Sequence, residues 1–210
     1  SFGDLRQGNN RLAAYPDFGK RLFYVSTEKG VDIINDNSSN VNIQKTTGYS
    51  QTDFLQKILF KPSANTEHLL NIQLSNSSNI NRYDRLTETS KGLPVYAEWY
   101  YGPQVRNVVS YNLNKKQLKG FFQELTVNTN YQHLEESRIS RKYKSNNKDF
   151  RFEKVDIIGF NADLLHSDKN GDIHFGVESY YNIVNSTARR TNIATLANSV
   201  ITTRYSDGPT

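Results

Sequence analysis

Arginine and aromatic side chains are concentrated in one segment of the chain, residues 79–104. Arginine donates charge-assisted hydrogen bonds to anionic groups, and aromatic rings supply large, rigid contact surfaces. Together they suit the binding of an anionic or aromatic ligand. The alternative is a loop that folds on itself, with Trp99 packed on a neighbouring proline and Arg85 paired with Glu98. The candidate binding residues are Arg82, Tyr83, Arg85, Tyr96, Trp99, Tyr100 and Tyr101.

Residue patterns that carry catalysis are missing from the sequence. There is no G-x-S-x-G nucleophile motif, no phosphate-binding loop and no dinucleotide fingerprint. Glu135 and Glu136 are adjacent, so in a strand they point to opposite faces and cannot share acid–base chemistry. We therefore do not expect an enzyme.

Metal-binding patterns are also missing. The four histidines form no pair of known ligand spacing, and segment 168–172 lacks the glycine and glutamate positions of a calcium loop. His133 could touch haem, but a solvated histidine at a strand end is the favoured interpretation. We expect no metal site and no cofactor.

Composition limits the class of protein further. The 210 residues carry a formal charge of +5, but the basic residues are dispersed among almost as many acids. Because no recognition module accompanies them, we exclude a nucleic-acid partner. No apolar run reaches the roughly eighteen residues of a transmembrane helix. The mean hydropathy of −0.70 is compatible with a membrane β-barrel, in which only alternate residues face lipid. The absence of cysteine suits a protein that crosses the periplasm unfolded.

Apolar and polar residues alternate with period two in six stretches, which predicts six strands. The clearest hairpin lies in 154–184, with Asn170 and Gly171 expected to supply the positive φ angles of its tight turn. Each arm alternates over about ten residues, the length at which a tilted strand crosses a bilayer, whereas soluble strands average about five or six. Two more strand pairs are expected at 48–78 and 105–136.

Short and long connections alternate along the chain. Up-and-down membrane barrels have short periplasmic turns and long extracellular loops. The predicted fold is therefore all-β, an antiparallel up-and-down transmembrane barrel with its long loops outside the cell. The short turns are expected at 61–68, 114–121 and 166–172, and the long loops at 1–47, 79–104, 137–153 and 185–210.

The two faces of the predicted strands differ in polarity. One face is apolar and is expected to contact outer-membrane lipid, and the other is expected to line a wet lumen. Tyr131, Tyr180 and Tyr181, near the predicted strand ends, form either an interfacial aromatic girdle or ordinary strand positions. The expected lipid-facing residues are Leu125, Val127, Ile158, Phe160, Phe175 and Val177. The expected lumen residues include Asn128, Asn130, Gln132, Asp156, Asn161, Asp163, Glu178 and Asn182.

Six strands do not close a membrane barrel, because the smallest have about eight and an open edge leaves backbone groups unpaired in hydrocarbon. We therefore expect a partial chain, completed by further strands of the same protein or by other copies.

Several short motifs, in this order and spacing, resemble the barrel region of TonB-dependent outer-membrane receptors of the Bacteroidetes type. The resemblance extends over nearly all 210 residues but concerns the barrel only. The motifs are GYSQ at 48–51, QK at 56–57, KP at 61–62, RYDRL at 82–86, GLP at 92–94, AEWYYGPQ at 97–104, EESR at 135–138 and EKVD at 153–156.

The resemblance implies a plugged barrel of about twenty-two strands in the bacterial outer membrane. It implies active uptake of a scarce nutrient, such as a ferric siderophore, haem or cobalamin, driven by the TonB complex through a plug that this sequence does not contain. A SusC-like importer of glycans or peptides, with a lipoprotein partner, is one alternative. A secreted, soluble β-sandwich that binds a ligand is another.

Overall fold

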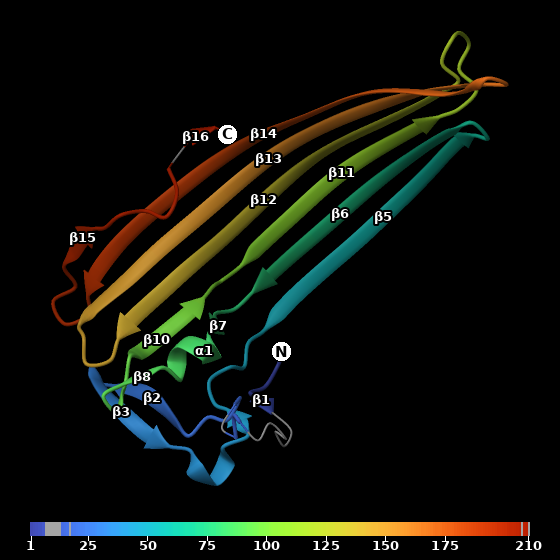
Figure 1. Ribbon diagram of the computed structural model, residues 1–210. Coiled ribbons are helices and arrows are strands. Elements are labelled where there is room, and N and C mark those ends of the chain that lie inside the picture. Colours follow the sequence, from blue (N-terminus) through green and yellow to red (C-terminus); the bar gives the residue numbers. More distant parts are fainter. Residues whose placement is uncertain (7–13, 17, 207, 210) are drawn as a thin grey trace.

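The computed structural model describes residues 1–6, 14–16, 18–206 and 208–209, and it is all-β with antiparallel pairing (Figure 1). Six long strands form one sheet in the order β14-β13-β12-β11-β6-β5, so strands that follow one another in the chain are hydrogen-bonded neighbours. They are β5 (Gln51–Ser63), β6 (Thr66–Ser77), β11 (Val105–Lys115), β12 (Glu124–Lys142), β13 (Asn147–Asp168) and β14 (Gly171–Asn192). All six predicted strands are confirmed.

The last three long strands extend well beyond their predicted ends, to 19, 22 and 22 residues. Segment 137–153, predicted as a long loop, is therefore mostly strand, and only residues 143–146 connect β12 to β13. The extension is rich in charged residues, and some of these pair across the ladder, although the Glu153 carboxylate is buried without a hydrogen-bond partner among the described residues. Arg190 Nε, for example, donates to Asp149 Oδ1 at 2.6 Å from the directly opposed position. A polar strand of this kind is stabilised by its backbone ladder and cross-strand pairs, which the apolar alternation does not reveal.

Two other predicted loops contain regular structure at the same end of the sheet (Figure 1). Segment 1–47 forms a β2–β3 hairpin and short pieces around it, and segment 79–104 forms a small helix and several short strands. Their elements are β1 (Leu5–Arg6), β2 (Phe23–Glu28), β3 (Val31–Asp36), the 3-10 helix η1 (Ser38–Asn40), β4 (Ile43–Gln44), β7 (Ile80–Asn81), α1 (Tyr83–Leu86), β8 (Thr89–Ser90), β9 (Leu93–Pro94) and β10 (Tyr96–Tyr101). In the predicted tail, 185–210, β14 continues and is followed by β15 (Asn198–Val200) and β16 (Gly208–Pro209).

Strand β10 continues the sheet where β11 leaves it. The first half of β12 pairs with β11, and its last part, from Arg138 to Lys142, pairs with β10. On its other side β10 pairs with β7, as β11 pairs with β6. Strands β6 and β7 therefore follow the path of one long strand with a break between them, and so do β10 and β11. The two breaks lie side by side in the sheet.

The cross-strand register carries one apolar face through all six long strands. Directly opposed residues share a face, and alternate residues along a strand return to it. Val127 opposes Ala162, which opposes Val177, and Leu125 is joined to Phe175 through Leu164. Ile158 lies between Tyr131 and Tyr181, one row from Phe160. The six residues predicted to share the apolar face therefore do so, and β11, β6 and β5 continue it with Val109, Leu113, Leu70, Ile72, Phe54 and Ile58.

Three details of the prediction are wrong. Asp156 lies on the apolar face, two residues from Ile158, where its Oδ1 accepts from the Tyr131 hydroxyl at 2.6 Å. The three tyrosines do not lie near strand ends, because β12–β14 are longer than predicted. Tyr180 is also on the opposite face from Tyr181. The β13–β14 turn is centred on residues 169–170, and of the expected Asn-Gly pair only Gly171 has a positive φ, of 145°.

The packed core lies where the small elements meet the end of β12, not in the central part of the six-stranded sheet. In the described part of the chain, the buried hydrophobic residues are Leu86, Ala97 and Ile139, from α1, β10 and the extension of β12. Among the described residues, both edges of the sheet are open over most of their length, since β5 pairs only with β6 and β14 has only the short β15 and β16 beyond it. No helix among the described residues is long and apolar enough to cross a membrane.

Candidate functional site

The candidate binding residues lie where β10, α1 and β7 meet the end of β12 (Figure 1). A register irregularity between Tyr96 and Glu98 places Glu98 opposite Arg141, and from there β10 alternates regularly. Trp99 and Tyr101 therefore share one face, and Glu98 and Tyr100 share the other. The predicted residues on β10 are divided between its two sides, so the seven predicted residues do not form a single cluster.

Arg82, Trp99 and Tyr101 form a compact cluster on the first side. The Arg82 guanidinium lies over the Trp99 ring, 4.8 Å from its centroid, and donates to the Tyr101 hydroxyl at 3.0 Å. Trp99 and Tyr101 meet edge to face, and Arg138 covers the Tyr101 ring at 5.4 Å. This arrangement of cations on aromatic faces is stabilising in itself.

The charge of Arg82 is partly compensated within its own segment. Its Nε donates to Asp84 Oδ1 at 2.8 Å, and its Nη2 pairs with the second carboxylate oxygen. The hydrogen bonds with Asp84 raise the pKa of Arg82 above its usual value. A ligand that bound this cluster would compete with Asp84 for the guanidinium.

The remaining candidates have other partners. The Tyr83 hydroxyl donates to the backbone carbonyl of Lys20. Arg85 forms an ion pair with Glu88, so the expected Arg85–Glu98 pair is wrong. The Trp99 ring contacts Arg82 and Tyr101. Tyr96 lines a separate cavity near Lys142, Asp149 and Arg190.

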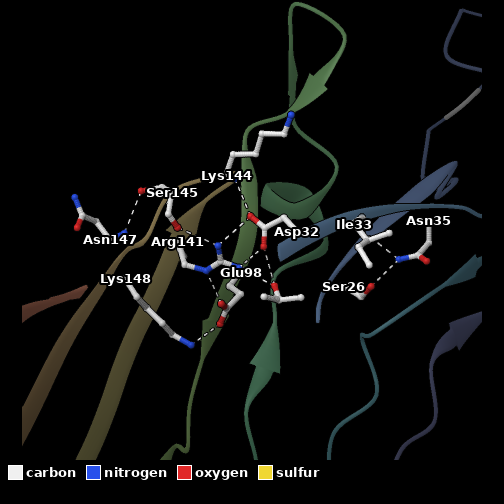
Figure 2. Close-up of polar contacts among 11 residues, drawn as sticks. Ser26, Asp32, Ile33, Asn35, Glu98, Arg141, Lys144, Ser145, Asn147 and Lys148 are labelled. Carbon is white, nitrogen blue, oxygen red and sulfur yellow. Dashed lines mark hydrogen bonds and ion pairs between the residues drawn. The ribbon is translucent and has the colours of Figure 1, made fainter. Parts of the chain in front are cut away.

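Sequence reasoning missed the most buried polar cluster, which joins Asp32 of β3 to Arg141, Glu98 and Lys148 (Figure 2). The side chains of Arg141 and Asp32 are both only 1% exposed. Arg141 uses all five of its N–H donors: two go to Asp32 at 2.6 and 2.9 Å, one to Glu98 Oε1 at 2.7 Å, one to Thr27 and one to the carbonyl of Ser145. The cluster fastens the β2–β3 hairpin to β10 and to the end of β12.

The charges of this cluster are balanced, two carboxylates against two cations. Burial by itself would raise the pKa of Asp32, but hydrogen bonds from Arg141, the Lys144 amide and Thr27 outweigh it and lower the pKa. Burial also opposes ionisation of Glu98, and hydrogen bonds from Lys148 and Arg141 lower its pKa. The cluster is therefore fully ionised at neutral pH.

A cavity of about 350 Å³ lies beside this cluster, on the second side of β10. Tyr100 and Glu98 line it from β10, Thr27 and Val25 from β2, and Arg21 from the residues just before β2. Of the predicted binding residues, Tyr100 lines this cavity, and Tyr83 lines a second cavity, of about 650 Å³, which the two predicted loops also build jointly. The sequence carries no local signal for the cavity beside the cluster, because its walls come from segments about 70 residues apart.

His133 lies within β12 and not at a strand end, and both of its ring nitrogens are engaged by carboxylates. Nδ1 lies 2.7 Å from Asp156 Oδ1 and Nε2 lies 3.1 Å from Glu135 Oε1. No group of three or more His, Asp or Glu residues in the described segments is arranged to hold a metal ion. In comparisons with protein-family models, curated proteins and solved structures, the chain has no match.

Proposed function

We propose that this chain forms an arc of a TonB-dependent transporter in the bacterial outer membrane. The transporter takes up a scarce nutrient of the ferric siderophore, haem or cobalamin class. The nutrient is captured at the elaborated end of the sheet, the end at which segments 1–47 and 79–104 form short strands and helices. The observation that carries the proposal is the continuous apolar face of the six long strands, which nothing in the described chain covers.

The size of that face argues for an apolar environment. Phe175, Val177 and Ile158 are 61%, 53% and 52% exposed, and similar residues repeat across β5, β6 and β11. Soluble monomers rarely expose contiguous apolar patches beyond a few hundred Å². Lipid would cover this face. Each Å² of apolar surface removed from water contributes roughly 25 cal/mol of favourable free energy.

Two features favour lipid over a second protein sheet. The apolar band ends at two successive rows of polar side chains on the same face. His133 is opposed to Asp156 in the first row, and Glu135 to Lys154 in the second, as expected where strands leave the hydrocarbon. The short turns at one end and the elaborated segments at the other match the asymmetry of outer-membrane barrels. Further strands, from the same protein or from another copy, would have to complete the open edges.

The ligand would meet the elaborated end first. There, Arg82, Trp99 and Tyr101 present cationic and aromatic groups on the face that we propose to line the lumen. Coupling to the TonB complex would require a plug outside these residues, and a lipoprotein lid would be an additional partner only in the SusC-like variant.

The test is cell fractionation followed by intact mass measurement of the native protein. We expect it in the outer-membrane fraction, in a species several times heavier than the 24.1 kDa of this chain. A soluble species near 24.1 kDa would overturn the proposal and favour a two-sheet binding domain.

A further inference from the structure

Arg21 carries a buried positive charge that has no ion-pair partner in the part of the chain that the structure describes. Its backbone is fixed, since its N–H donates to the Val41 carbonyl at 2.8 Å and its own carbonyl accepts from Asn37 Nδ2 at 2.8 Å. The residue is 1% exposed, yet Nε and Nη1 have no hydrogen-bond partner, and no ion pair to Arg21 occurs among the described residues. An isolated buried charge is costly, so a group that balances it would be strongly favoured.

Arg21 lines the cavity of about 350 Å³ beside β10, near the lower end of the size range of small-molecule sites. The acid in the cavity wall, Glu98, does not balance it, because its carboxylate is already shared by Arg141 and Lys148. Asp4 and Tyr83 act on Arg21 electrostatically, without an ion pair or a hydrogen bond to it. The Arg21 guanidinium therefore has no ion-pair partner among the described residues.

The other polar groups of the cavity wall are mostly occupied. Asn81 Nδ2 donates to the Thr46 carbonyl, and the Thr27 hydroxyl donates to Asp32 while accepting from Arg141. Arg21 is thus the main source of donors still free to meet a ligand. Its planar guanidinium stays protonated and matches the oxygens of a carboxylate or a phosphate.

We propose that this cavity binds a small oxyanion, a carboxylate or phosphate group, on Arg21. The inference goes beyond the transport proposal and does not rest on it, because the cavity walls belong to the β2–β3 hairpin and β10 and not to the apolar face. The oxyanion would supply the missing negative charge and would hold the two predicted loops together.

The test is calorimetric titration of the purified full chain with citrate and, separately, inorganic phosphate, at constant ionic strength. We expect saturable binding of at least one of them, with affinity reduced by about tenfold or more in Arg21→Met. The matched control is Arg106→Met, since Arg106 is an exposed residue of β11 and does not line the cavity. It should bind like the wild type. Binding of citrate alone identifies a carboxylate site, and binding of phosphate alone identifies a phosphate site.

Hydrogen exchange of the wild-type protein gives a second readout that needs no variant. The bound anion should slow exchange in β2 and β10 and leave β5 and β14 unchanged. Absence of binding by both anions, equal binding by Arg21→Met, or protection elsewhere would each overturn the inference. The transport proposal would be unaffected, since it is decided by membrane fractionation.

Discussion

Arg141 holds the β2–β3 hairpin more firmly than any surface ion pair could. Removing one partner of a buried pair leaves the other uncompensated and costs about 3–5 kcal/mol. Arg141→Ala should therefore lower the free energy of opening of the hairpin by roughly that amount, because Asp32 would stay buried without its main partner. Residue-resolved hydrogen exchange over residues 23–36 measures this.

The control for this substitution is Arg85→Ala. Arg85 pairs with Glu88 at the surface, and exposed pairs contribute about 0–1 kcal/mol. If both variants lost the same protection, the buried cluster would not be what fastens the hairpin.

The same cluster makes the hairpin sensitive to acid. Because the pKa values of Asp32 and Glu98 are lowered in the folded protein, their stabilisation is fully present above their ordinary pKa values, about 4. It is lost as the pH falls through the lowered values. We expect exchange protection in β2 and β3, corrected for intrinsic rates, to fall below about pH 4 while that of β12 and β13 persists. Protection in the hairpin that stayed constant to pH 3 would contradict this.

At the scale of elements, the change of partner along β12 depends on Gly102, which lies between β10 and β11. Its N–H donates to the Ser137 carbonyl, and the Ser137 hydroxyl donates back to its carbonyl. Gly102 has a φ of 138°, and an added Cβ would lie 2.6 Å from the Cα of Asn79. Gly102→Ala therefore combines an unfavourable φ with a backbone clash.

Gly120 provides a matched comparison, since its φ is 127° but its Cβ would have open space. We expect Gly120→Ala to cost about 1 kcal/mol and Gly102→Ala a further 1–3 kcal/mol or so, as measured by denaturant unfolding of the purified protein. Equal losses would mean that the close approach of β7 and β10 contributes little.

At the scale of the whole molecule, the two faces of the sheet should respond oppositely to charge. Val127 lies on the apolar face and Asn128 on the polar one, in the same strand and at the same depth. In a bilayer, Val127→Arg should cost about 2–4 kcal/mol, whereas Asn128→Arg should be nearly neutral. Folding titrations into lipid vesicles measure the difference. Similar folding free-energy costs for the two variants would contradict the proposal that the apolar face contacts lipid.

The alternation of apolar and polar residues in the sequence was sufficient to predict the six long strands of the central sheet. Side chains alternate faces in any strand, so the shared face of Leu125, Phe160 and Val177 follows from local order alone. The same reasoning located all three hairpins, since each has a short polar connection between two alternating arms. The concentration of arginine and aromatic residues in 79–104 also located part of the candidate site, the cluster of Arg82, Trp99 and Tyr101.

Only the tertiary structure decided which charged residues meet. Asp32 and Arg141 are 109 positions apart, and nothing local favours Arg141 over any other arginine as its partner. Glu98 binds Arg141 and Lys148 instead of the nearby Arg85, because β10 adds to the sheet beside β12. The isolated charge of Arg21 likewise arises only when the hairpin docks on β10 and encloses it. Periodicity reports which face a residue occupies, whereas burial and pairing depend on what packs against that face.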